Sequence, residues 1–254
     1  MTEQFARTKI LLGHEAMERL ARARVAVFGI GGVGGHVCEA LARSGVGAFD
    51  LIDDDRVCIT NLNRQIIATH RTIGRYKTEV MRERILEINP EADVRVHQCF
   101  FLPENAGQFP FAEYDYVVDA VDTVTAKIEL ILRARENHVP VISSMGAGNK
   151  LDASAFRVAD IYETKMCPLA RVLRRELKKR NVEHLKVVYS EEEPLVPQEA
   201  KEAGLQTDAG QGTTQEKRSG RRRAVPGSVA FVPSVAGLIL AGEVVKDLII
   251  PMQC

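Results

Sequence analysis

The chain has 254 residues, of which 45% are hydrophobic and 27% charged, and its 34 basic side chains balance its 34 acidic ones. This composition is ordinary for a folded globular protein, and it excludes a disordered chain, a collagen-like repeat and a disulfide scaffold. Net neutrality also excludes a wholly basic surface that would coat nucleic acid, but it allows a local basic face.

The two ends of the chain bear on its location. The N-terminal segment is charged throughout and lacks the apolar core of a signal peptide. The apolar stretch 228–250 is interrupted by Pro233, Glu243, Lys246 and Asp247. A membrane span needs about 20 predominantly apolar residues, so this stretch reads as a buried or subunit-contacting helix. We therefore expect a cytoplasmic protein that does not insert into a membrane.

Short apolar runs alternate with amphipathic segments along the chain, which is typical of an α/β fold with a mostly parallel sheet. Up to residue 150 the expected strands cover residues 24–29, 48–53, 94–99, 116–121 and 139–144, and the expected helices cover 33–44, 77–88 and 125–137. After residue 150 we expect strands at 155–161, 186–190 and 228–232, a basic helix at 168–180 and a mostly apolar helix at 234–249.

The change of rhythm near residue 150 suggests how the fold is organised. We expect a Rossmann-like, mostly parallel sheet with flanking helices and a smaller C-terminal lobe. Residues 1–150 would form the core with an N-terminal helical arm, and residues 151–254 the C-terminal lobe of the same domain. Residues 191–227 are polar with few large apolar side chains, which predicts a long mobile loop.

The first expected strand runs into Gly29-Ile30-Gly31-Gly32-Val33-Gly34, a GxGxxG pattern with a strand before it and a helix after it. In such a turn Gly29 permits the bend, Gly31 lets a phosphate approach the backbone, and Gly34 allows close helix–strand packing. The helix N-terminus then offers free N–H groups to an anion. Asp53, at the end of the second expected strand, is placed to accept ribose hydroxyls, so these residues predict a nucleotide site.

Charged residues further along indicate which nucleotide would bind. The pyrophosphate of a dinucleotide is satisfied by the helix end, whereas Arg64 and Lys77 supply two cations suited to a triphosphate. Asp122, closing the expected strand YVVDAVD, offers the hard oxygen ligand that a phosphate-bound magnesium ion prefers. Because these residues follow successive strands, the sequence favours ATP over NAD and makes residues 1–150 the expected ATP-binding core.

The turn GIGGVG, the run DDDRVCITNLNRQ, Lys77 and the segment DAVDT resemble the adenylation domain of the ubiquitin-activating-enzyme-like (ThiF/MoeB-type) superfamily. Besides the glycines, the positions that match its nucleotide site are Asp53, Asp55, Asn61, Arg64, Gln65 and Lys77. The resemblance implies that Asp53 contacts the ribose, and that Asn61, Arg64 and Lys77 contact the phosphates.

Two further roles are implied by the same resemblance. Asp122 would hold magnesium. Arg7, in the segment FART, would cross the interface of a homodimer to reach the partner's ATP. Arg64, Lys77, Asp122 and Arg7 would together carry the catalysis.

The five cysteines lie at positions 38, 58, 99, 167 and 254, and no two have the CxxC spacing of a zinc site. Activators of sulfur-carrier proteins in this superfamily typically hold a structural zinc ion through two CxxC pairs, so their absence argues against a close molybdopterin or thiamine activator. The chain is more similar to the tRNA threonylcarbamoyladenosine dehydratase subfamily, through the segments VCITNLNRQI, GRYKTEVMRERILEINP, VVDAVDTVTAK, SSMGAGNKLD and residues 159–177.

This similarity implies a reaction that needs neither an enzymic cysteine nor zinc. ATP would activate the threonine carboxylate of a modified adenosine in tRNA as a carboxyl-adenylate, with release of pyrophosphate. The neighbouring carbamoyl group would then close a ring and release AMP, with loss of water overall. Residues 171–186, with seven basic and two acidic side chains, and the basic loop 217–223 are the expected tRNA contacts.

Two other functions stay open at this point. The first is adenylation of the C-terminal glycine of a ubiquitin-like sulfur-carrier protein, with Cys167 at a helix start as a possible thiol relay. The second is an NAD(P)-binding oxidoreductase or redox sensor, which would have no use for Arg64 or Lys77.

Overall fold

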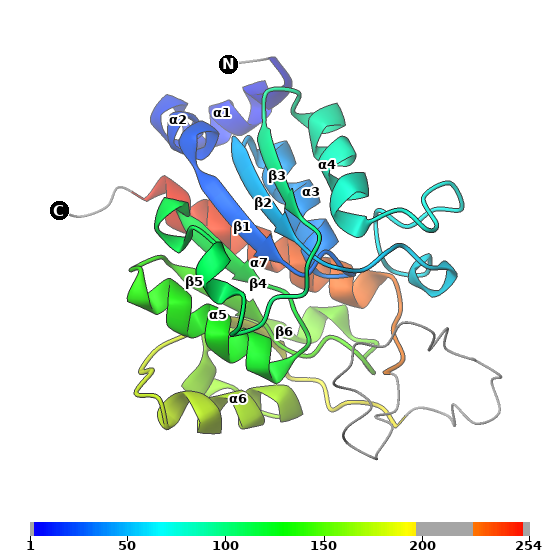
Figure 1. Ribbon diagram of the computed structural model, residues 1–254, viewed down its shortest axis with the longest axis vertical. Coiled ribbons are helices and arrows are strands. Elements are labelled where there is room, and N and C mark those ends of the chain that lie inside the picture. The colour runs from blue at the N-terminus through cyan, green and yellow to red at the C-terminus, as the bar shows by residue number, and fades with distance from the viewer. Residues whose placement is uncertain (1–2, 197–225, 251–254) are drawn as a thin grey trace.

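The computed structural model describes residues 3–196 and 226–250, and they form a single seven-stranded sheet with helices on both faces (Figure 1). The strands are β1 (Arg24–Phe28), β2 (Ala48–Ile52), β3 (Asp93–His97), β4 (Tyr116–Asp119), β5 (Val141–Ser144), β6 (Phe156–Asp160) and β7 (Lys186–Ser190). Their order across the sheet is β3-β2-β1-β4-β5-β7-β6. Neighbouring strands are parallel except β6 and β7, which pair antiparallel.

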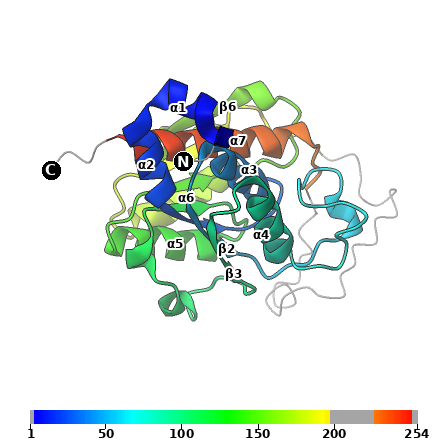
Figure 2. The same ribbon diagram turned by 90° about the horizontal axis from the view of Figure 1, so that it is seen from above.

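The helices fall into two layers (Figure 2). They are α1 (Ala6–Leu12), α2 (His14–Arg22), α3 (Gly34–Ser44), α4 (Lys77–Ile88), α5 (Val124–Glu136), α6 (Pro168–Lys178) and α7 (Phe231–Ile249). Helices α3, α4 and α7 cover one face of the sheet, and α5 and α6 cover part of the other. The predicted mostly parallel α/β fold is therefore confirmed.

Strand β1 shows why the sheet needs both layers. Val25 and Val27 join the core beneath α3 and α7, whereas Ala26 and Phe28 join a second core on the opposite face. A parallel strand buried on both sides is apolar at successive positions, which is why residues 24–29 lack a polar alternation. On the first face α7 crosses α3 so closely that a Cβ on Gly237 would lie 2.5 Å from the carbonyl oxygen of Val33.

One predicted element is wrong. Residues 228–230 are irregular, and α7 already begins at Phe231, so no strand covers 228–232. The apolar run there has strand-like composition, but Pro233 falls in the first turn of a helix, where its missing N–H leaves no hydrogen bond unmade. Of the expected loop 191–227, residues 191–196 are irregular, and 197–225, including the basic run 217–223, lie outside the described residues.

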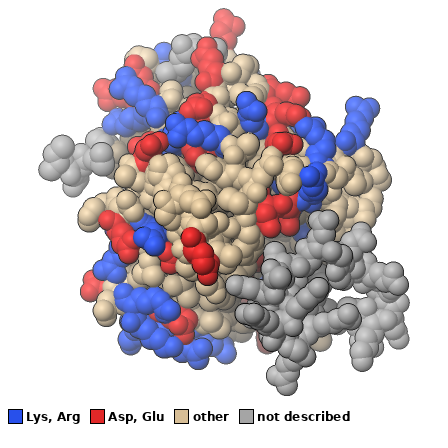
Figure 3. All heavy atoms as spheres, in the orientation of Figure 1, with Lys and Arg blue, Asp and Glu red and all other residues tan. Residues whose placement is uncertain are grey.

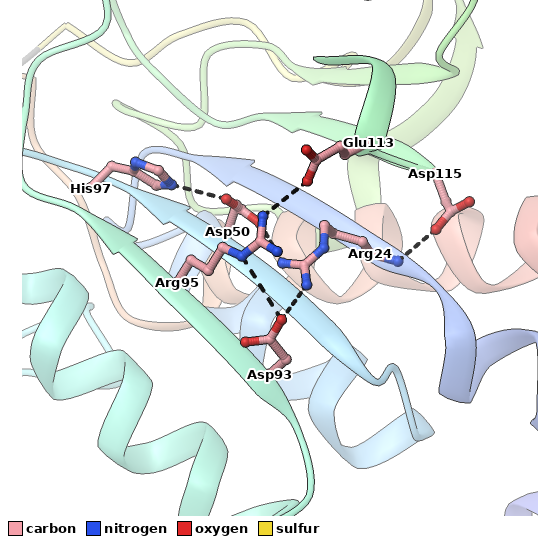
Figure 4. Close-up of polar contacts among 7 residues, drawn as sticks. All are labelled: Arg24, Asp50, Asp93, Arg95, His97, Glu113 and Asp115. Carbon is pink, nitrogen blue, oxygen red and sulfur yellow. Dashed lines mark hydrogen bonds and ion pairs between the residues drawn. The ribbon is translucent and has the colours of Figure 1, made fainter. Parts of the chain in front are cut away.

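The face of β1, β2 and β3 opposite α3 and α4 carries charged side chains (Figure 4). Asp50, fully buried, accepts hydrogen bonds from His97 Nε2 at 2.9 Å and from Arg24 Nη1 at 2.8 Å. Arg24 also pairs with Asp93, and Arg95 bonds Glu113 at 3.0 Å. Burial raises the pKa of Asp50, but the hydrogen bonds and charges of His97 and Arg24 outweigh it and hold that pKa below its usual value.

Among the residues that the structure describes, no helix has both the length and the apolar character that crossing a membrane requires.

Candidate nucleotide-binding site

The turn between β1 and α3 is built so tightly that only glycine fits at two of its positions. Gly29 has a φ of +89°, and a Cβ there would lie 2.7 Å from the carbonyl oxygen of Ala120 in the loop after β4. A Cβ on Gly34 would lie 1.8 Å from the carbonyl oxygen of Gly29. The turn therefore holds the first residues of α3 close to the ends of β1 and β4. This exposes backbone N–H groups at the edge of the sheet where the strands end.

The loop that contains Arg64 and Gln65 lies against this turn. A Cβ on Gly32 would be 3.3 Å from Cγ of Arg64, and a Cβ on Gly31 would be 3.9 Å from Nε2 of Gln65. Arg64 is half-buried, and its Nη1 donates to the carbonyl oxygen of Thr60 at 2.9 Å. The structure thus places Arg64 next to the glycine turn, although the two are far apart in the sequence.

Gln65 is only 5% exposed, and among the described residues its Oε1 has no hydrogen-bond partner. A buried carbonyl oxygen without a donor is costly, so this atom marks a place where a bound molecule could supply one. Asn61 has a structural role in this loop, because its Oδ1 accepts a hydrogen bond from the backbone N–H of Cys58 at 3.1 Å.

Asp53 and Lys77 lie on the other side of the turn. Asp53 Oδ2 accepts the N–H of Ile30 at 2.7 Å, which ties the end of β2 to the glycine turn, and its Oδ1 accepts from Asp55 N at 2.9 Å. Lys77, the first residue of α4, is 5% exposed, and its Nζ lies 2.5 Å from Asp55 Oδ2 and 3.7 Å from Asp53 Oδ1. Burial raises the pKa of Asp53, while the charge of Lys77 opposes that rise.

These contacts also bear on where a divalent metal could bind. The carboxylates of Asp53, Asp54 and Asp55 lie within 4.8 Å of one another, but the ammonium group of Lys77 already contacts two of them. Asp122 differs, because it is exposed and accepts only a 3.3 Å hydrogen bond from the Thr123 hydroxyl among the described residues. An exposed carboxylate in the loop after β4 fits the magnesium ligand that the sequence suggested.

Strand β4 ends at Asp119, so Asp122 lies in the following loop and does not close the strand as expected. The loop is anchored by a network that the sequence analysis missed. The ammonium group of Lys127 is fully buried, bonds both carboxylate oxygens of Asp119 at 3.0 and 3.1 Å, and donates to the carbonyl oxygen of Ser144 at 2.7 Å. The signal that could have revealed it is a lysine on the apolar side of the helix, between Ala126 and Leu130.

Arg7 is not part of this assembly within one chain. It is exposed on α1, which packs beside α2 at the end of the sheet where β1 begins (Figure 1). The glycine turn lies at the opposite end of β1. Cys167, considered above as a thiol relay, precedes α6 and is only 4% exposed.

The fold and this site together define a class of protein, an α/β nucleotide-binding protein whose glycine turn is flanked by two cations. The sequence profile of the ThiF family matches residues 4–251. The chain therefore belongs to the ThiF family.

Its relatives agree with the resemblance found in the motifs. The chain is 43% identical to the tRNA threonylcarbamoyladenosine dehydratase of Bacillus subtilis over 252 residues, which cover 98% of this chain and 96% of the relative. It is 46% identical to the Escherichia coli protein of that name over 176 residues, which cover 69% of this chain and 66% of the relative.

The solved structures include the Escherichia coli dehydratase in complex with ATP, with a TM-score of 0.82 and 35% identity over 97% of this chain and 93% of that one. The structure of the same enzyme with AMP gives a TM-score of 0.83 at the same identity, covering 97% and 94% of the two chains.

Proposed function

We propose that this chain catalyses the ATP-dependent dehydration of N6-threonylcarbamoyladenosine in tRNA through a carboxyl-adenylate, releasing AMP and pyrophosphate. One observation carries the proposal. Arg64 and Gln65 pack against a glycine turn, and Lys77 lies beside Asp53, which bonds that turn, in a chain that is similar along nearly its whole length to a dehydratase of that name. Two cations beside a phosphate-binding turn suit a triphosphate better than the pyrophosphate of a dinucleotide.

The residues of this site supply positioning and charge. The ribose would lie near Asp53, and the phosphates against the glycine turn between Arg64 and Lys77. The substrate carboxylate would attack the α-phosphorus in line, and pyrophosphate would leave with its negative charge met by the two cations. The carbamoyl group of the same substrate would then attack the activated carbonyl carbon and displace AMP. No protein nucleophile is required at any step.

Asp122 is the residue we expect to hold a magnesium ion. Bound there with the phosphates, the ion would neutralise part of their charge. Removal of divalent cations with EDTA should abolish AMP formation, and added magnesium should restore it.

We infer that tRNA lies along α6. Lys and Arg side chains gather over this helix at the lower edge of the molecule (Figure 3). Several of them are engaged within the protein: Lys179 and Arg180 bond Glu176, whose pKa they lower to about 2. Lys186 belongs to β7 and pairs with Asp247 on α7 at 2.7 Å.

Three exposed cations lie along one side of α6, namely Arg171, Arg175 and Lys178, and of these Arg175 approaches Glu176 only at 3.7 Å. They are spaced by four and three positions, so they project from one face of the helix. Such a row can contact successive phosphates without reading bases. The loop 217–223 would add further cations.

We also infer a homodimer in which Arg7 acts at the partner's site. Ile10 and Leu11 on α1 are 85% and 82% exposed, and they lie about one turn after Arg7. Phe231 and Leu238 on α7 are half exposed, and α2 packs against both α1 and α7. A second copy that covers the apolar side chains of α1 would bring Arg7 next to a different subunit.

The two parts of the chain would have separate roles in this function. Residues 1–150 contribute the nucleotide site and the N-terminal arm, and residues 151–254 contribute the lobe that carries α6. A protein that acts on tRNA would do so in the cytoplasm.

Exchange of labelled pyrophosphate into ATP tests this function, because it reports a reversible adenylation step. We expect exchange that depends on tRNA containing threonylcarbamoyladenosine. Exchange that responds to a ubiquitin-like carrier protein would support the sulfur-carrier alternative, and no exchange with either would overturn adenylation. The burial of Cys167 argues against the thiol relay that the carrier alternative would use.

A further inference from the structure

The segment that leaves β2 pairs with the segment that leads into α4. The N–H of Val57 donates to the carbonyl oxygen of Arg75 at 2.9 Å, and the N–H of Gly74 donates to that of Val57 at 2.8 Å. The N–H of Lys77 donates to the carbonyl oxygen of Asp55 at 3.1 Å, and Arg56 and Tyr76 form an isolated antiparallel bridge. We call residues 55–57 and 74–77 the clamp.

Two side chains hold the clamp together from outside. The guanidinium carbon of Arg56 lies 3.8 Å from the centre of the Tyr76 ring, which is a cation–π contact. Arg56 Nη1 also donates to the carbonyl oxygen of Gly74 at 2.7 Å. Arg56 is exposed and Tyr76 is half-buried, so neither belongs to the hydrophobic core.

The clamp determines where α4 begins. Tyr76 is the N-cap residue of α4, with extended backbone angles, and it makes no side-chain capping hydrogen bond. The first turn is instead fixed by the Lys77 hydrogen bond to Asp55 and by the hydrogen bond from Val80 N to the carbonyl oxygen of Tyr76 at 3.1 Å. Without a capping side chain, this first turn depends on the pairing across the clamp.

The clamp fixes the position of the Lys77 side chain. Its ammonium group is held beside Asp53, which in turn binds the N–H of Ile30 in the glycine turn. We propose that Arg56 and Tyr76 are positioning residues, which hold Lys77 against the phosphates of ATP by stacking across the clamp. This inference rests on the proposed function and adds two residues that touch neither ATP nor the substrate carboxylate.

The test compares Tyr76→Ala with Tyr76→Phe, which keeps the stacked ring, and with Arg75→Ala. Arg75 is the matched control because it lies in the same segment, and among the described residues its side chain pairs with Glu83 on α4 and with no residue of 55–57. The three variants and the wild type are assayed for tRNA-dependent AMP release at a temperature where circular dichroism shows all four folded.

We expect Tyr76→Ala to lower kcat by about 10- to 100-fold with a smaller change in the KM for ATP, because a displaced Lys77 fails to meet the charge that develops on the leaving pyrophosphate. Tyr76→Phe should stay within about threefold of the wild type, since the ring is retained. Arg75→Ala should also leave kcat unchanged. Equal rates for Tyr76→Ala and Arg75→Ala, or a Tyr76→Phe as slow as Tyr76→Ala, would overturn the proposal.

Hydrogen exchange separates a failure of this proposal from a failure of the proposed function. Tyr76→Ala should speed exchange at the amides of Lys77 and Val80 by at least about tenfold, and Arg75→Ala should not. Unchanged protection of these amides in Tyr76→Ala contradicts the clamp whatever the enzyme does. A wild type that makes no AMP with its tRNA contradicts the function, while the exchange comparison still decides the clamp.

Discussion

At the scale of single residues, the proposed chemistry depends most on Lys77. Its ammonium group is buried beside Asp53 and Asp55, so it cannot be replaced by a cation from solvent. Lys77→Ala should lower AMP formation at least about 100-fold, because a preorganised charge on the transferred phosphates is removed. Arg82→Ala, which removes an exposed cation from the same helix, is the control and should keep full activity. The rate of AMP release at saturating ATP is compared for the two variants. A fully active Lys77→Ala would mean that Lys77 does not stabilise the charge of a bound triphosphate.

Some residues of the site could be predicted from the sequence because backbone geometry restricts what can stand there. Gly29 and Gly34 stand where the backbone approaches too closely for any Cβ, and Asp53 could be predicted because it comes directly after the neighbouring strand β2. Arg56, Tyr76 and the buried ammonium group of Lys127 could not be predicted in the same way. Their partners come from other segments, and only the folded chain shows which charges are buried together.

At the scale of elements, helix α6 offers the most direct test of the proposed tRNA substrate. Replacing Arg171, Arg175 and Lys178 together by alanine should weaken tRNA binding and lower the salt dependence of the affinity by about one unit of slope for each phosphate that is no longer neutralised. Lys179 and Arg180 are the pair for comparison, because both hydrogen-bond Glu176, at 2.8 and 2.9 Å, whereas Arg175 only approaches it at 3.7 Å. Their double alanine variant should bind tRNA with nearly the wild-type salt slope, as measured by filter binding over a range of salt. Equal salt slopes for the triple and the double variant would mean that tRNA binds another surface of the protein.

The charged face of β1, β2 and β3 makes the stability of the fold depend on pH. The folded-state pKa of Asp50 lies below its unfolded value of about 3.9, so its contribution is complete above that pH and disappears as the pH falls through the folded pKa. Asp50→Asn should therefore destabilise the protein at neutral pH by about 3–5 kcal/mol, since Arg24 and His97 are left without a buried partner.

Urea denaturation at several pH values measures this effect. The free energy of unfolding should fall less steeply for Asp50→Asn than for the wild type below about pH 4. Glu104→Gln, which removes an exposed carboxylate, serves as the control and should follow the wild-type curve. Parallel curves for Asp50→Asn and the wild type would mean that Asp50 carries no pH-dependent stabilisation.

Whole elements were predictable where the apolar periodicity was regular, and α4 (Lys77–Ile88) has the bounds that the sequence analysis expected. The start of α7 was not predictable, because Val229, Phe231 and Val232 have a strand-like composition although the last two belong to the helix. There the packing of α7 on α3 decided the structure. Local propensity yields to such tertiary contacts.

At the scale of the whole molecule, the proposed dimer has a consequence that single variants cannot show. If Arg7 serves the partner's site, Arg7→Ala and Lys77→Ala chains should each be inactive, but a mixed dimer would hold one site with both residues intact. Random mixing by unfolding and refolding should then restore about a quarter of the wild-type activity. Size-exclusion chromatography with light scattering confirms that the mixture is dimeric. A mixture that is dimeric but inactive would mean that Arg7 does not act at the partner's active site.

The proposed mechanism requires that the substrate carboxylate, and no group of the protein, attacks the α-phosphorus of ATP. The most direct measurement uses tRNA whose threonylcarbamoyl carboxylate is labelled with heavy oxygen, followed by mass spectrometry of the AMP released. We predict that AMP carries one labelled oxygen and that the nucleoside is lighter by one molecule of water. Unlabelled AMP, or label recovered in pyrophosphate, would contradict the mechanism.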